Sequence, residues 1–113
     1  SASVYKIKGT GAAAIATSAT VPVGRTYSLV SVTCHFSAAP TTSQAFTVKL
    51  NANAGAAYDT TIYSVDPSSG SVTDILYQPT YPLLFEGGDA IDVAYTNTDT
   101  RTYGVQITLK EES

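Results

Sequence analysis

Two neighbouring side chains have the chemistry of a nucleophile and of a general base, and each type occurs once: Cys34 and His35. Cys34 is in phase with Val32 and Phe36, so we expect it to be a small buried hydrophobic residue rather than a nucleophile. A single cysteine also excludes an internal disulfide and any multi-cysteine metal site. His35 falls on the polar face of the same predicted strand. No serine elbow, phosphate loop or second histidine accompanies it, so we expect a solvated or structurally hydrogen-bonded imidazole.

Three carboxylates near the C-terminal end, Asp89, Asp92 and Asp99, are candidates for acid–base work or calcium binding. Asp89 and Asp92 are three apart in an extended stretch and point to opposite faces. Asp99 belongs to the far end of that strand, roughly 20 to 30 Å away at about 3.3 Å per residue. We therefore expect no shared site and assign Asp89 and Asp99 to turns, because aspartate readily bonds neighbouring backbone. The sequence predicts no catalytic residue, no metal site, no cofactor and hence no enzyme.

Tyrosine is abundant, with eight copies and no tryptophan. Tyr58, Tyr63, Tyr77 and Tyr81 fall in or beside the middle strands and form a candidate interaction surface. Exposed tyrosines can stack on sugar rings or anchor a protein interface. The alternative is that most of them are half-buried, with only the hydroxyl group reaching water.

The charge balance limits the partners of the chain. Charged residues make up 13% of the sequence, the net charge is −3 and the pI is near 4.7. A weakly acidic surface of this kind does not attract the negatively charged phosphates of DNA or RNA, so we expect no nucleic-acid partner. No apolar run approaches the roughly 20 residues that span a bilayer, and the N-terminal residues lack the apolar segment of a signal peptide. We expect a soluble protein with no membrane partner.

The stretch from Leu83 to Leu109 carries the clearest structural pattern. Large apolar residues alternate with small or polar ones on both sides of the polar run 97–101, which predicts a β-hairpin with one apolar face. Gly87, Gly88 and Asp89 form the bend that leads into its first arm. The apolar residues of the two arms are Ile91, Val93, Tyr95, Tyr103, Val105, Ile107 and Leu109.

Further short strands precede this stretch. In the first, Val4–Lys8, two lysines face water, where they protect a sheet edge. The third, Tyr27–Phe36, is expected to be a central strand. A proline-containing turn over Asp66–Gly70 and a stiff loop over Pro79–Pro82 separate the later ones. The predicted strands are Val4–Lys8, Ala12–Thr20, Tyr27–Phe36, Phe46–Leu50, Asp59–Val65 and Val72–Tyr77.

This pattern predicts one domain over residues 1–113, built as an all-β antiparallel sandwich of eight or nine short strands. The mixture of hairpins with longer connections favours a jelly roll over an up-and-down barrel. The expected core residues are Val30, Val32, Cys34, Phe36, Phe46, Val48, Leu50, Ile91, Val93, Tyr95, Val105, Ile107 and Leu109.

The pattern L-x-x-G-G-D-A-I-D-V-x-Y, followed by a polar turn and Y-G-V-x-I-x-L, resembles the closing strand pair of certain jelly-roll domains. These occur in trimeric proteins of the tumour-necrosis-factor and C1q type and in phage virion proteins. Most of the chain from Val21 onward resembles small structural proteins of tailed bacteriophages. The resemblance implies a virion component without catalytic residues, most specifically a homotrimeric capsid decoration protein that binds and stabilises the lattice of the major capsid protein.

Two other binding roles fit the same residues. A tail-tip or fibre domain would have much the same sequence, and a carbohydrate-binding β-sandwich module would also use exposed aromatic residues. The absence of tryptophan and of an evident calcium loop argues against the sugar-binding alternative. The resemblance argues for it, because phage surface domains often bind sugars, so a surface glycan remains an alternative partner.

Overall fold

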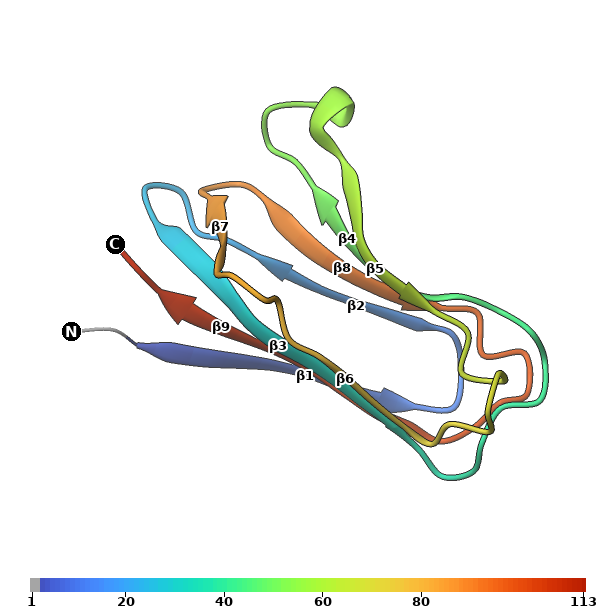
Figure 1. Cartoon of the computed structure of the whole chain (residues 1–113). Helices are drawn as coiled ribbons and strands as arrows, with labels where there is room; N and C mark the ends of the chain where they lie inside the picture. The colour runs from blue at the N-terminus through green and yellow to red at the C-terminus, as the bar shows by residue number, and fades with distance from the viewer. Residues whose placement is uncertain (1–2) are drawn as a thin grey trace.

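The computed structural model describes residues 3–113, and these form nine β-strands in two antiparallel sheets packed face to face (Figure 1). The predicted all-β sandwich is confirmed. A short 3-10 turn, η1 (Ala56–Tyr58), interrupts the strands. The strands are β1 (Val4–Gly11), β2 (Ile15–Thr20), β3 (Thr26–Phe36), β4 (Phe46–Asn51), β5 (Thr60–Val65), β6 (Asp74–Tyr77), β7 (Leu83–Glu86), β8 (Ala90–Tyr95) and β9 (Tyr103–Glu111). No helix in this part of the chain has the length and apolar character needed to cross a membrane.

The strand order is that of a jelly roll. Sheet A has the order β1-β9-β3-β6, with β7 also paired to β3, and sheet B has the order β2-β8-β4-β5. β6 pairs with Val32–His35 and β7 with Thr26–Leu29, so the two short strands act as one interrupted strand along the same edge of β3. Strands from the two ends of the chain thus interleave in both sheets, as two Greek keys require.

The predicted hairpin over Leu83–Leu109 is wrong. β8 pairs with β2 and β4 in sheet B, whereas β9 pairs with β1 and β3 in sheet A. The alternation correctly predicts that both arms turn their apolar sides to the core. It does not distinguish a hairpin from two strands that face each other across that core. The intervening polar loop crosses between the layers.

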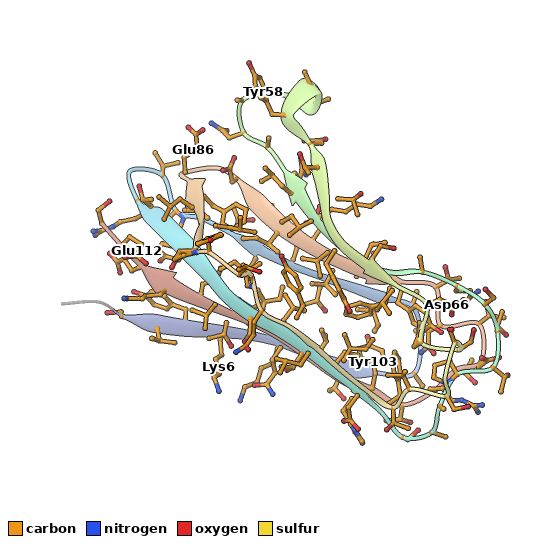
Figure 2. The ribbon with its side chains drawn as sticks, in the orientation of Figure 1. Lys6, Tyr58, Asp66, Glu86, Tyr103 and Glu112 are labelled. Carbon is orange, nitrogen blue, oxygen red and sulfur yellow. The ribbon has the colours of Figure 1, made fainter. Side chains whose placement is uncertain are left out.

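One cluster of buried side chains from both sheets fills the space between them (Figure 2). Nearly all expected core residues are in it, and Leu50 packs against it partly buried. Val30 is the exception, with 40% of its surface exposed. The pairing of β3 with β9 shifts between Leu29 and Ser31, so Val30 is the extra residue of a β-bulge. The bulge changes the phase of the strand, and Tyr27 and Leu29 face the core instead.

Candidate functional site

The four candidate tyrosines differ in exposure and in their contacts. Tyr58 in η1 is 64% exposed, and Tyr81 in the loop between β6 and β7 is 78% exposed. Tyr63 of β5 and Tyr77 of β6 are partly buried and stack on each other, with ring centroids 4.6 Å apart. This pair joins the edge strands of the two sheets, so its aromatic surface is used within the fold.

Cys34 and His35 have the environments that the sequence predicts. Cys34 is buried, and burial raises the pKa of its thiol to about 12. His35 lies on the outer face of sheet A, where Nδ1 is 2.6 Å from Oδ1 of Asp74 on the neighbouring strand β6. This hydrogen bond, with a second from Thr73, lowers the pKa of the Asp74 carboxyl group. His35 is thus both exposed and hydrogen-bonded.

The three C-terminal carboxylates are separated, and two of them hold loops. Asp89 is buried and accepts hydrogen bonds from the backbone N–H groups of Asn53 and Glu86. Asp99 accepts from the N–H groups of Thr41 and Thr42 and from the Thr42 hydroxyl, which lowers its pKa to about 2. The partners of Asp99 lie in the distant loop between β3 and β4, so sequence proximity does not reveal them.

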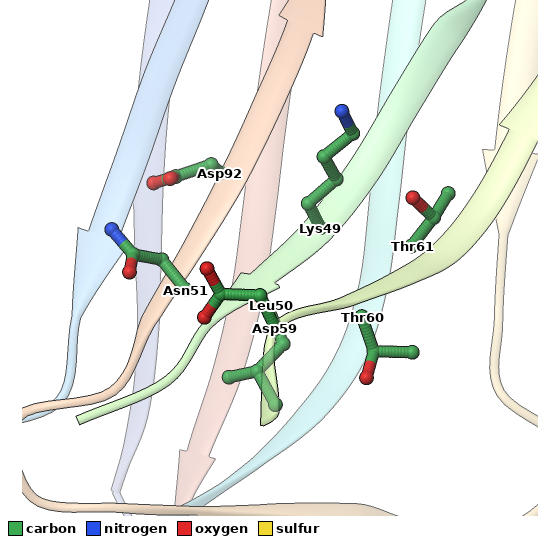
Figure 3. Close-up of a pocket in the computed structure, with 7 residues that line it drawn as sticks. All are labelled: Lys49, Leu50, Asn51, Asp59, Thr60, Thr61 and Asp92. Atoms are coloured by element: carbon green, nitrogen blue, oxygen red, sulfur yellow. The ribbon is translucent and has the colours of Figure 1, made fainter. Parts of the chain in front are cut away.

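The outer face of sheet B holds an open pocket of about 370 Å³, which we call the sheet B pocket (Figure 3). It lies where the register between β4 and β5 shifts after Val48, so that Ile62 is an extra residue in β5. Such bulges re-aim side chains and are common beside binding sites. The pocket is lined by Lys49, Leu50, Asn51, Asp59, Thr60, Thr61 and Asp92.

Two carboxylates of this pocket are held by the protein through one oxygen each. Oδ1 of Asp59 accepts the Ala52 N–H at 2.8 Å, and Oδ1 of Asp92 accepts the Ser18 hydroxyl at 2.5 Å. Lys49 lies directly opposite Asp92 in the β4–β8 register, yet within the described residues no ion pair of 4.0 Å or less joins them. The pocket therefore combines two oriented carboxylate acceptors with the ammonium group of Lys49, which forms no ion pair with Asp92.

The sequence alone does not reveal this pocket. The only usable signal was the outward phase of Lys49, Asn51 and Asp92. Because the pairing of β4 with β8 is not readable from the sequence, these residues could not be placed side by side.

The outer face of sheet A is different, because it carries apolar side chains. Leu76 of β6 and Leu84 of β7 are 61% and 65% exposed, and Val30 projects from the bulge in the neighbouring strand β3. Val4, which is 61% exposed, lies on β1 at the opposite edge of the sheet. None of the exposed large apolar residues in the described chain lies in a strand of sheet B. We call the outward residues of sheet A the sheet A face. Next to Leu76 this face is hollowed over Gly104, between His35 and Gln106.

A scan against known protein families and a search of curated proteins found no match to this chain. Over residues 3–113, no group of three or more His, Cys, Asp or Glu side chains is placed to hold a metal ion.

Proposed function

We propose that this protein is a bacteriophage virion component that decorates the capsid, docking on the lattice of the major capsid protein through the sheet A face. The observation that carries this proposal is the exposure of Leu76 and Leu84 on the edge strands β6 and β7, together with that of Val30 on the adjacent strand β3. Single exposed apolar residues are ordinary, but several together on one rigid face mark an interaction surface.

The composition of the sheet A face suits a lattice. Its centre carries threonine and serine along β3 and β9, and these short side chains lose less rotamer entropy than long ones when a partner covers them. Lys6 and Lys8 on the edge strand β1 add charge at the rim, and Figure 2 shows Lys6 pointing away from the opposite sheet. Many weak contacts of this kind add up when a lattice repeats the site.

The choice of a phage capsid as the lattice comes from the resemblance of the chain to structural proteins of tailed phages, together with the jelly-roll strand order. The same resemblance supports a homotrimer, which fits a three-fold lattice position. Light scattering at high protein concentration tests the trimer. A mass near that of the 11.8 kDa chain would remove the trimer but not the docking proposal, since some accessory proteins assemble only on the lattice.

The test mixes the purified protein with cognate heads stripped of accessory proteins and measures cosedimentation and the rupture temperature of the heads. We expect saturable binding with a fixed copy number per capsomer and a higher rupture temperature. The double variant L76S/L84S should lose binding. V23S is the matched control, because Val23 is 91% exposed in the turn between β2 and β3 and lies outside the sheet A face.

Failure of the wild-type protein to bind heads would contradict the proposal. Gold labelling of intact virions would then test the tail-tip or fibre alternative. Equal loss of binding in L76S/L84S and in V23S would also count against the sheet A face, because it would show that any exposed apolar residue matters.

A further inference from the structure

We propose that the sheet B pocket binds a neutral sugar through neighbouring hydroxyl groups of the ring. This is a second binding function, on the sheet opposite the proposed docking face, and it does not depend on the capsid proposal. A copy docked through sheet A would leave this pocket open to solvent, because the outer faces of a two-layer sandwich point in opposite directions.

The sheet B pocket presents a mixture of hydrogen-bonding groups. A sugar hydroxyl donates one hydrogen bond and accepts others, so its site needs acceptors and donors side by side. The pocket supplies carboxylate acceptors from Asp59 and Asp92 and donors from Lys49 and Asn51. The Thr61 hydroxyl group can act as either, and the Thr60 hydroxyl group, which donates to the Tyr58 carbonyl oxygen, can accept. Figure 3 shows these groups coming from three neighbouring strands and from the residue that precedes β5.

Four of these side chains, Lys49, Asn51, Asp59 and Asp92, retain hydrogen-bonding capacity. In Asp59 and in Asp92, Oδ1 accepts a hydrogen bond from the protein, which orients the carboxylate. Oδ2 of each can then accept a hydrogen bond from a hydroxyl group of the ligand. The side chains of Lys49 and Asn51 make no hydrogen bond to any other residue in the described range. Hydrogen bonds from neutral hydroxyls to charged groups are stronger than neutral pairs, so oriented carboxylates favour a polyol ligand.

The charge and size of the pocket also limit its ligand. Two carboxylates outnumber one ammonium group, so the pocket is net negative and disfavours acidic sugars. A volume of about 370 Å³ lies at the lower end of the roughly 300 to 1,000 Å³ of small-molecule sites, which suits one sugar ring. The pocket is open, and a ligand that stays largely solvated binds weakly. We therefore expect dissociation constants in the millimolar range.

The test is a nuclear magnetic resonance titration of the isotope-labelled protein with methyl glucoside, methyl galactoside, methyl mannoside, N-acetylglucosamine and galacturonic acid. A separate titration uses Ca²⁺ alone, because two carboxylates can also hold a cation. We expect at least one neutral sugar to cause saturable shifts confined to the backbone amides around Asn51, Thr60 and Asp92, and galacturonic acid to bind more weakly.

Variants K49A and N51A should each weaken sugar binding by about tenfold or more, which corresponds to the loss of one strong hydrogen bond. K8A is the matched control, because Lys8 is an exposed strand lysine of sheet A, and it should bind as the wild type does. The proposal would be overturned if no neutral sugar caused a saturable shift, whether or not Ca²⁺ caused one. It would also be overturned if K49A and N51A both bound sugar as tightly as the wild type. None of these outcomes bears on head binding.

Discussion

Short polar side chains hold the loops of this protein, and Asn97 is the most consequential. It is 2% exposed, and its amide nitrogen donates to the carbonyl oxygens of Ala12, Ala13 and Arg101. Its amide oxygen accepts the Arg101 N–H. The loop that crosses from sheet B to sheet A is thereby tied to the connection between β1 and β2.

We expect Asn97→Ala to lower the free energy of unfolding by about 3 kcal/mol, because buried carbonyl groups lose their donors. Urea denaturation followed by circular dichroism measures it. Asn53→Ala is the control, since Asn53 is exposed and its hydrogen bond to Asp89 is made by the backbone, and it should change stability by less than about 0.5 kcal/mol. Equal effects of the two substitutions would contradict this assignment of Asn97.

Asp99 makes the stability of the fold dependent on acid. Hydrogen bonds from Thr42 and Thr41 lower its pKa from 3.8 to about 2 in the folded protein. The carboxylate therefore contributes stability above the unfolded pKa, and this contribution is lost as the pH falls from 3.8 through about 2.

The variant D99N should be less stable than the wild type at neutral pH and should lose less stability on acidification. Urea midpoints measured at neutral pH and at several steps through that acid range check this. D92N is the control, because it leaves the bonds of Asp99 in place and should keep the acid-dependent loss. A D99N profile parallel to that of the wild type would show that Asp99 does not contribute.

At the scale of elements, the turn between β7 and β8 packs directly on the loop between β2 and β3. A Cβ atom at Gly87 would lie 2.9 Å from backbone atoms of Pro22, Val23 and Gly24. Backbone cannot move aside as a flexible side chain can, so this contact requires glycine. At Gly104, by contrast, an added Cβ would meet nothing within 4 Å.

We expect Gly87→Ala to destabilise the protein by about 1 to 3 kcal/mol through overpacking. Gly104→Ala should be neutral or stabilise it by up to about 1 kcal/mol, because alanine restricts the unfolded chain more than glycine does. Chemical denaturation of both variants gives the comparison. A stable Gly87→Ala protein would mean that the two loops separate easily.

Strand positions could be predicted from the sequence because alternation follows from the geometry of a single strand. The inward sides of β4, β8 and β9 are correct for this reason. Val30 was misplaced because a bulge depends on the pairing of β3 with β9, which no local pattern encodes. The bulge in β5 that shapes the sheet B pocket escaped prediction for the same reason.

At the scale of the whole molecule, the jelly roll could be predicted from the number of strands and the lengths of their connections, but the assignment of strands to sheets could not. Ile91 and Ile107 look alike in the sequence, and each lies in a different layer. A binding site on one layer, such as that of Lys49 with Asp92, requires this assignment. The candidate tyrosines lie in η1, β5, β6 and the loop after β6, and no local pattern indicates which of them share a face.

The two outer faces differ in their lysines, which allows the docking orientation to be measured. Lys6, Lys8 and Lys110 are exposed on the outer side of sheet A, whereas Lys49 is exposed on sheet B. If the protein binds heads through sheet A, these three lysines should lose reactivity toward an acetylating reagent when heads are present, and Lys49 should keep it. Mass spectrometry of the free and head-bound protein gives the acetylated fraction at each position. Protection of Lys49 with continued reactivity of Lys6 and Lys8 would reverse the orientation and would make the sheet B pocket part of the capsid contact.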